Sequence, residues 1–206
     1  MLAELNRKDA DIEAIAKKAL KDDGLQGEML ENLGSKNETI RYNSHKVLLL
    51  LAQEHPETLY PKWDYFVQFL DSENTYHKLS AIEILASLTC ADAANKFEKI
   101  FSRFYALMND KSFITAGYLA RASGTIAKAK PKLQTKITNR LLNIDKTHHD
   151  PERRDLVKAS AIEALAEYFD RAKNKKRIVD FVKEQLNSKS PKTRKVARDF
   201  LQHVGK

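Results

Sequence analysis

Lys78-Leu79-Ser80-Ala81-Ile82-Glu83-Ile84-Leu85 is a stretch that the chain repeats 80 residues later as Lys158-Ala159-Ser160-Ala161-Ile162-Glu163-Ala164-Leu165, with six of eight positions identical. Each copy lies early in a helical pattern and follows an acidic, polar turn. Weaker versions of the stretch begin at positions 41, 115 and 194. The five starting positions are separated by 37, 37, 43 and 36 residues. A period near 40 residues is typical of helix pairs that stack into a solenoid.

The spacing of apolar residues divides the chain into helix pairs, each with a first helix A, a short turn and a second helix B that carries the repeated stretch. Residues 2–22 carry an apolar stripe without a paired helix, so we expect one helix that caps the first pair. We predict an all-α fold, a right-handed α-solenoid of about five helix pairs forming a single domain over residues 1–206. Its predicted parts are a capping helix at 1–23 and repeats at about 25–56, 57–92, 93–129, 130–173 and 174–204.

Four individual residues carry structural expectations. Gly117 and Gly124 lie inside the predicted B helix of the third repeat, where each costs about 1 kcal/mol relative to Ala. We interpret them as sites where another helix approaches closely. Trp63 is expected in the stacked core rather than on a binding surface. The lone Cys90 excludes an internal disulfide and is expected to be a small buried residue.

Three features recur at equivalent positions: an Asp in the A–B turn, a basic residue early in helix B, and a small residue three positions later. They occur at Asp71, Asp110 and Asp150; at Arg41, Lys78, Lys158 and Arg194; and at Ser44, Ala81, Ala161 and Ala197. In this pattern residues 25–204 resemble HEAT repeats, which are α-solenoid helix pairs of about 40 residues. Thr115 departs from the pattern, and the first and fifth repeats lack the turn Asp.

The resemblance implies roles for these positions. In HEAT repeats the turn Asp and the basic residue of helix B typically form a ladder between repeats, and the small residue lets helices approach. These roles are structural. The same basic positions could instead contact a ligand, and both interpretations stay open at this point.

Positive charge is concentrated in the second half of the chain. Residues 1–103 contain 13 Lys and Arg against 17 Asp and Glu, whereas residues 104–206 contain 23 against 11. Several of the basic residues fall in the opening turns of two successive B helices, which a solenoid would stack along one edge. Such an edge could attract phosphates or an acidic protein. The predicted binding ridge consists of Arg153, Arg154, Lys158, Lys192, Arg194, Lys195 and Arg198.

Motifs that indicate catalysis are missing from the sequence. It has no phosphate-binding glycine loop and no nucleophile elbow. His148, His149, Asp150 and Glu152 have no recognisable third-ligand spacing, and Asp150 is already useful as a helix cap. We therefore expect no enzyme activity, no catalytic residue, no cofactor and no metal. HEAT-like alkylpurine DNA glycosylases are a third hypothesis, because they are basic proteins of similar size. They use aromatic residues and an acid on the inner face, whereas no acid is marked out here beside Tyr118 or Tyr168.

The leading hypothesis is a non-enzymatic scaffold that binds a protein partner. An acidic partner would complement the positive charge of the ridge. The alternative is sequence-independent binding of a nucleic-acid backbone through the basic C-terminal half. The N-terminus is charged and lacks the apolar core of a signal peptide, and no apolar run reaches 18 residues. We expect a cytoplasmic protein without membrane association. The oligomeric state and the partner's identity do not follow from the sequence.

Overall fold

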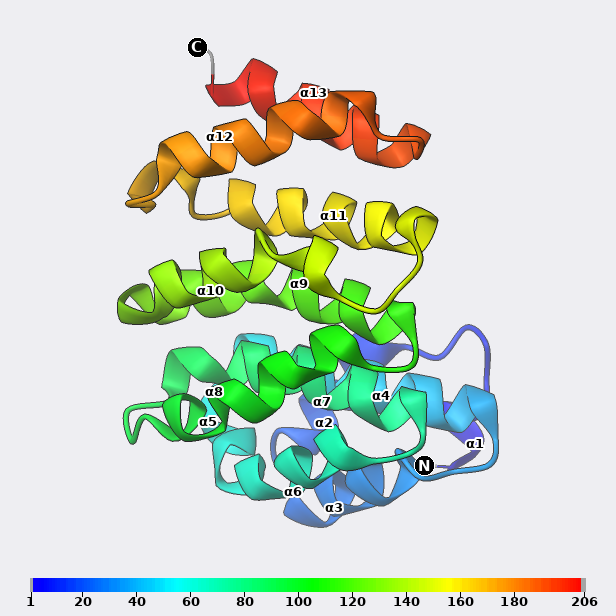
Figure 1. Cartoon of the computed structure of the whole chain (residues 1–206). Coiled ribbons are helices and arrows are strands. Elements are labelled where there is room, and N and C mark those ends of the chain that lie inside the picture. The colour runs from blue at the N-terminus through cyan, green and yellow to red at the C-terminus, as the bar shows by residue number, and fades with distance from the viewer. Residues whose placement is uncertain (1, 205–206) are drawn as a thin grey trace. The chain divides into compact units, whose positions relative to one another are not determined.

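The computed structural model describes residues 2–204, and it is built from helices joined by short turns (Figure 1). No β-strand occurs among these described residues. This confirms the all-α prediction. The chain divides into two compact units, unit 1 (Met1–Lys96) and unit 2 (Phe97–Lys206), and the boundary falls at the start of the third predicted repeat. The single-domain organisation stays a prediction.

Unit 1 contains the capping region and the first two predicted helix pairs. Helix α4 is the first B helix and α7 the second, and the two pack against each other. The helices of unit 1 are α1 (Leu2–Leu5), α2 (Ile12–Ala19), α3 (Asp23–Asn32), α4 (Glu38–Glu54), α5 (Pro56–Leu59), α6 (Trp63–Gln68) and α7 (Thr75–Leu88).

The prediction of one continuous helix over residues 2–22 is wrong, because α1 and α2 are separate. The side chain of Asp11 caps α2 by accepting a hydrogen bond from the backbone N–H of Ala14 at 2.9 Å. The buried Asn43 of α4 donates through Nδ2 to the carbonyl oxygens of Leu5 and Arg7, at 2.9 and 2.8 Å. These contacts satisfy the carbonyls at the end of α1 and explain why the chain turns there. Helix α2 nevertheless packs on α3 and α4, as expected of a capping element.

Unit 2 contains the last three predicted pairs, and its B helices are α9, α11 and α13. Helix α11 contacts both α9 and α13, while α10 packs on α9 and α12 on α13. Helix α11 ends at Ala166, and residues 169–171 form a separate 3-10 turn within the predicted fourth repeat. The helices of unit 2 are α8 (Lys96–Ala106, which begins at the unit boundary), α9 (Phe113–Ala129), α10 (Gln134–Leu141), α11 (Pro151–Ala166), α12 (Lys175–Glu184) and α13 (Pro191–Val204).

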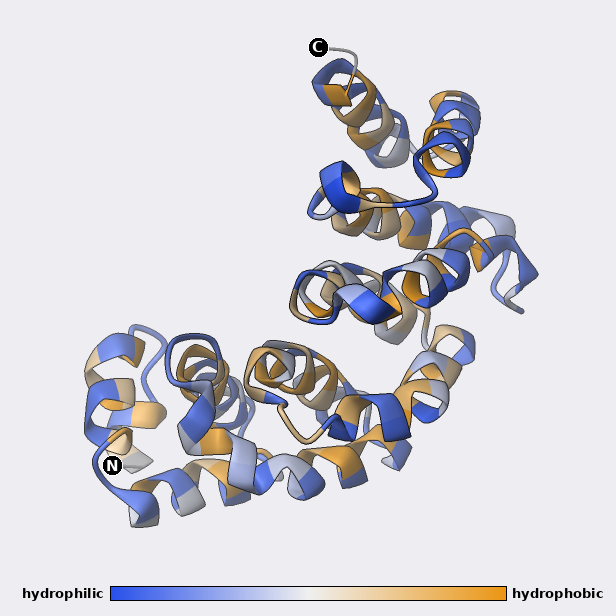
Figure 2. Ribbon diagram, turned by 90° about the vertical axis from the view of Figure 1, so that its left-hand side faces the viewer, coloured by the Kyte–Doolittle hydropathy of each residue, from blue (hydrophilic) through white to orange (hydrophobic). Residues whose placement is uncertain are grey.

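The helices carry both hydrophobic and hydrophilic residues, as expected for elements that bury one side (Figure 2). Trp63 is 1% exposed, which confirms its place in the core. The small residues three positions after each basic anchor, Ser44, Ala81, Ala161 and Ala197, are all fully buried. Cys90 contradicts its prediction. It is exposed because it lies in the 3-10 turn Thr89–Ala91, beyond the end of α7.

The two glycines of α9 differ in their surroundings. A β-carbon built at Gly124 would lie 3.1 Å from the α-carbon of Ala164 and within 2.7 Å of the side chain of Glu167, both in or next to α11. A β-carbon at Gly117 would meet no atom within 4 Å. The close-approach interpretation therefore holds for Gly124 and is wrong for Gly117.

Candidate binding surface

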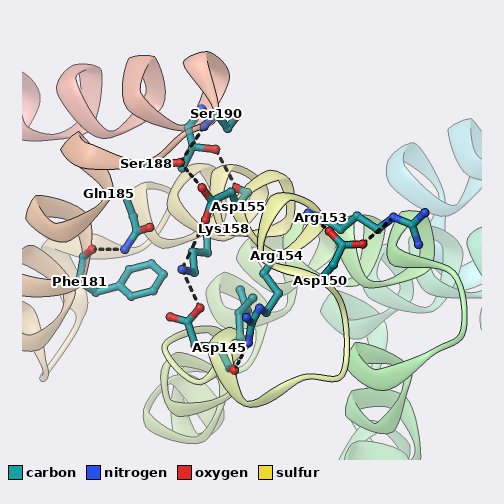
Figure 3. A network of polar contacts seen from close by, with 12 residues as sticks. Asp145, Asp150, Arg153, Arg154, Asp155, Lys158, Phe181, Gln185, Ser188 and Ser190 are labelled. Atoms are coloured by element: carbon teal, nitrogen blue, oxygen red, sulfur yellow. Dashed lines mark hydrogen bonds and ion pairs between the residues drawn. The ribbon is translucent and has the colours of Figure 1, made fainter.

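Lys158, at the centre of the predicted binding ridge, forms ion pairs within the fold (Figure 3). Its side chain is largely buried, and its Nζ lies 2.7 Å from Oδ1 of Asp145 and 3.6 Å from Oδ1 of Asp155. Asp145 belongs to the turn that precedes α11, and Asp155 lies one helical turn before Lys158. A buried ammonium needs such partners, because leaving it unpaired would cost several kcal/mol. Lys158 therefore secures the turn to the helix.

Asp155 extends this network to the next repeat. Its Oδ2 accepts a 2.6 Å hydrogen bond from Oγ of Ser188, and its carbonyl oxygen accepts one from Oγ1 of Thr193 at 2.7 Å. Ser188 and Thr193 belong to the turn before α13 and to α13 itself. A polar connection between these two helix pairs therefore exists here. It runs through Asp155 rather than through the turn residue Asp150, which instead caps α11 by accepting from the backbone N–H of Arg153.

Two further basic residues of the ridge are used in the same way. Arg154 donates from Nη1 to the carbonyl oxygen of Asp145 at 2.6 Å. Arg194 donates from Nη1 to the carbonyl oxygens of Ser188 and Lys189, at 2.6 and 2.9 Å. In unit 1 the equivalent Arg41 donates to the carbonyl oxygen of Ser35 at 2.9 Å. The basic residue of helix B thus recurrently closes the turn before its own helix.

The other four ridge residues are exposed, and we call them the exposed basic set: Arg153, Lys192, Lys195 and Arg198. Arg153 forms an ion pair with Asp150, with Nε 3.1 Å from Oδ2, and its guanidinium lies over the ring of Phe113 at 5.3 Å. Lys192, Lys195 and Arg198 follow one another at three-residue spacing and therefore share one side of α13. Unit 2 as a whole contains 25 Lys and Arg against 12 Asp and Glu, a net charge of +13.

The structure adds a feature that sequence reasoning missed. Among the residues whose burial is described, six large apolar side chains are exposed, and five of them lie in the first two turns of B helices, the exception being Leu186. The sequence hides this signal because each of the five lies in a helical segment that also supplies buried residues. With their exposed fractions, they are Tyr42 (56%), Tyr76 (52%), Ile114 (47%), Leu156 (40%) and Tyr118 (39%).

Ion pairs fix the register between α9 and α11. Arg121 Nη2 lies 3.1 Å from Oε2 of Glu163, and these residues are 42 positions apart. Ile114 and Leu156 are also 42 positions apart, so they lie in one row across the two helices. Tyr118 lies one turn beyond Ile114 on the same side of α9. We call Ile114, Tyr118 and Leu156 the apolar patch.

Two members of the exposed basic set, Lys192 and Arg153, lie next to this patch. The hydrogen bond between Thr193 and Asp155 holds the opening turn of α13 against that of α11, next to Leu156. Lys192 lies in that opening turn, and Arg153 lies one turn before Leu156 on α11. The sequence analysis named these two basic residues but not the apolar patch beside them.

Unit 1 carries a smaller surface of related composition. The guanidinium of Arg41 lies over the ring of Tyr76 at 4.4 Å, and Nζ of Lys46 lies over the ring of Tyr42 at 4.6 Å. Because α4 and α7 pack together, both exposed rings lie on neighbouring helices. Cations held over aromatic faces fix the orientation of rings that are more than half exposed.

Farther along α11 and α13 the character of the surface changes. A groove of about 340 Å³ lies between these helices, with an apolar base that includes the edge-to-face pair of Phe169 and Phe200, at 5.2 Å between ring centroids. Its rim carries carboxylates. The groove is lined by Ile162, Glu163, Ala166, Phe169, Asp170, Val196, Asp199, Phe200, His203 and Val204.

The side chains of His149, Tyr168 and Trp63 are buried in the fold and are not available to a ligand. His149 is buried with Nε2 3.1 Å from the carbonyl oxygen of Met108, and burial lowers the pKa of its imidazole. No group of three potential metal ligands occurs among the described residues. Tyr168 is buried beside Thr138, with the two hydroxyl oxygens 2.9 Å apart, and burial raises its pKa to about 12. Trp63 is buried as well, so neither ring faces a ligand.

Within residues 2–204 no helix combines the length and the apolarity that crossing a bilayer requires.

Comparison with known proteins gives a fold likeness. No protein-family model matches the chain, and no protein with a curated description matches it. Among solved structures, the chain is similar to the crystal structure of an engineered protein from the Northeast Structural Genomics Consortium. The sequence identity is 19% and the TM-score 0.59, and the match covers 99% of this chain and 87% of the engineered one. At this identity the likeness concerns the fold alone.

Proposed function

We propose that this chain is a non-enzymatic protein-interaction scaffold that binds its partner on the exposed side of its B helices. One observation carries the proposal: five of the six exposed large apolar side chains lie in the opening turns of α4, α7, α9 and α11. Exposed apolar side chains scattered singly need no explanation, but a recurrent placement in the opening turns of B helices does. Tyrosine is also enriched at the energetic centres of protein interfaces.

The proposed architecture is a right-handed, HEAT-like solenoid. Within unit 2 the B helices α9, α11 and α13 contact one another in chain order, and within unit 1 α4 contacts α7. The turn-closing basic residues Arg41, Lys158 and Arg194 support the same interpretation, because they recur at the spacing of the repeat. Stacked repeats present equivalent residues in rows, which is how such scaffolds build extended binding surfaces.

The distribution of side chains in unit 2 favours a protein ligand over phosphates. Lys158, Arg154 and Arg194 are engaged by the turns, so they contribute less to an exposed ridge than the sequence suggested. Two of the four exposed cations, Lys192 and Arg153, lie next to the apolar patch. An apolar centre with a polar, charged rim is the usual anatomy of a protein–protein interface.

Affinity capture with matched variants tests the proposal. The wild-type chain, the double variant Ile114→Ser/Leu156→Ser and the control variant Leu186→Ser are used as baits in lysate of the source cells, each with and without nuclease. Leu186 is exposed at 37% and lies outside the B helices, in the turn after α12. We expect a protein that survives nuclease and is retained by wild type and Leu186→Ser but lost from the double variant. Equal capture by all three baits, or capture that disappears with nuclease, would overturn the proposal.

Sequence-independent binding of a nucleic-acid backbone is the second candidate. The exposed basic set favours it, because Lys192, Lys195 and Arg198 make no hydrogen bond or ion pair with the described residues. Phosphates also bind near the positive ends of helices, and α13 begins next to these side chains. The nuclease arm of the capture experiment separates this candidate from the first.

A further inference from the structure

The charges around the apolar patch are unevenly placed. The first eight residues of α13, Pro191–Arg198, include four basic residues and no acidic one. Arg194 is engaged by the preceding turn, which leaves Lys192, Lys195 and Arg198 exposed on one side of the helix. The first eight residues of α13, whose opening turn packs beside Leu156, therefore carry three cations that no described residue neutralises. The positive end of the α13 dipole adds to the same field.

Negative charge lies farther along α11 and α13, beyond their opening turns. Glu163 and Asp199 line the groove between α11 and α13, and Asp170 lies at its far rim. Glu163 is paired with Arg121, whereas Asp170 and Asp199 make no hydrogen bond or ion pair with the described residues. A carboxylate of a partner would be repelled from this groove and attracted to the opening turns of α13. The surface thus distinguishes the two ends of a docked segment.

We infer that unit 2 docks an acidic segment of another protein, with apolar side chains of the segment seated on Ile114, Tyr118 and Leu156 and its carboxylates placed over Lys192, Lys195 and Arg198. This inference rests on the proposed function and adds the chemistry of the partner. Burial of the apolar patch supplies affinity, since these three side chains retain 39–47% exposure in the free chain. The cations supply selection for acidic segments and raise the rate of encounter.

The decisive probe is a short fluorescent peptide in which a run of Asp and Glu precedes leucines at helical spacing. Three comparison peptides are used: one with serines in place of the leucines, one with lysines in place of the acids, and one with both changes. Binding is measured by fluorescence anisotropy near physiological ionic strength. We expect the acidic leucine peptide to bind at least about tenfold more tightly than each comparison peptide. Equal binding of the acidic serine peptide would show plain charge attraction and would overturn the inference.

Charge-reversal variants test the placement of the acids. Lys192→Glu/Lys195→Glu/Arg198→Glu removes the cations next to the patch. The control Lys173→Glu/Lys176→Glu/Lys183→Glu changes the net charge equally at exposed positions in and before α12. We expect the first variant to weaken peptide binding at least about tenfold and the control by less than about threefold. An equal loss in both variants would assign the effect to net charge and contradict the docking site.

A partner captured from lysate distinguishes the proposed function from the proposed acidic chemistry of the ligand. A partner that is lost from Ile114→Ser/Leu156→Ser and displaced by the acidic leucine peptide supports both the function and its ligand chemistry. A partner lost from that variant but insensitive to the peptide and to the α13 reversal leaves the docking face in place and overturns its acidic ligand. Capture that does not depend on the patch overturns the proposed function itself.

Discussion

Gly124 of α9 faces Ala164 of α11 so closely that a β-carbon at position 124 would lie 3.1 Å from the Ala164 α-carbon. The contacted atom of Ala164 belongs to the backbone and cannot rotate away. A β-carbon at position 124 would therefore force the two helices apart by a few tenths of an ångström. The contact belongs to the helix pair that carries the apolar patch. It therefore helps to position Ile114 beside Leu156, because the distance between α9 and α11 sets the distance between these two residues.

Substituting each glycine of α9 by alanine gives opposite results. Gly117→Ala adds a methyl group in open space within a helix and should stabilise the fold by about 0.5–1 kcal/mol. Gly124→Ala gains the same propensity but forces the α9–α11 contact apart, so we expect a net destabilisation of about 1–3 kcal/mol. Chemical denaturation of both variants measures the difference. Equal shifts of the two midpoints would contradict the close approach.

Lys158 should matter for stability rather than for binding. Lys158→Met keeps the aliphatic stem but removes the ammonium from Asp145 and Asp155, and we expect a loss of about 1–3 kcal/mol. The matched change Lys195→Met, at an exposed position, should stay within about 0.5 kcal/mol of wild type. Unfolding midpoints in urea check both values. An unchanged unfolding midpoint for Lys158→Met would contradict the structural role and make Lys158 a candidate for ligand binding.

Stability should fall on mild acidification because of buried imidazoles. Burial lowers the pKa of His149 and of His77, so the unfolded chain binds protons more readily than the folded chain. Above about pH 7.5, one unit above the ordinary imidazole pKa of about 6.5, the imidazoles are largely neutral in both states, and the free energy of unfolding hardly depends on them. It decreases as the pH falls below that value. Replacing His149 by Gln should flatten the pH dependence between about pH 7 and 5.5, whereas His148→Gln, at an exposed site, should leave it steep.

Nucleic-acid binding should be weak. If the four exposed cations contacted phosphates of duplex DNA, the logarithm of the affinity would fall against the logarithm of salt with a slope of about −3.6. We expect no dissociation constant tighter than about millimolar near physiological ionic strength for duplex DNA, single-stranded DNA or RNA. A gel-shift and anisotropy series with all three checks this. Micromolar binding with that slope, lost in the α13 charge reversal, would favour the second candidate function.

Much of the secondary structure followed from the sequence, because helical periodicity, proline and capping residues act locally. The start of α11 at Asp150-Pro151 is one example, since the carboxylate caps the helix and proline fits its first position. The N-terminal helix was misjudged because its interruption depends on Asn43, a residue of α4 that contacts α1 only after folding. Cys90 was misjudged for a related reason, since the helix ends just before it.

The sequence analysis named the basic residues of the candidate site but not its apolar ones. Sequence spacing brings seven basic residues to adjacent turns, but it cannot tell which side chains turn back to bond their own loop. Lys158, Arg154 and Arg194 do so, and Lys192, Lys195 and Arg198 do not. Ile114 and Leu156 escaped notice because a single exposed apolar position within a helical pattern looks like part of the core. Their pairing depends on the register between α9 and α11.

Site-specific photo-crosslinking from position 156 tests the central claim most directly. A photoreactive phenylalanine analogue replaces Leu156 in one chain and Lys176, an exposed residue of α12, in another, and both are irradiated in the source cells. We predict a discrete protein adduct from position 156 that is absent from position 176 and resistant to nuclease. Adducts that are equal at the two positions, or that consist of nucleic acid, would contradict the account of a protein-docking face on α9 and α11.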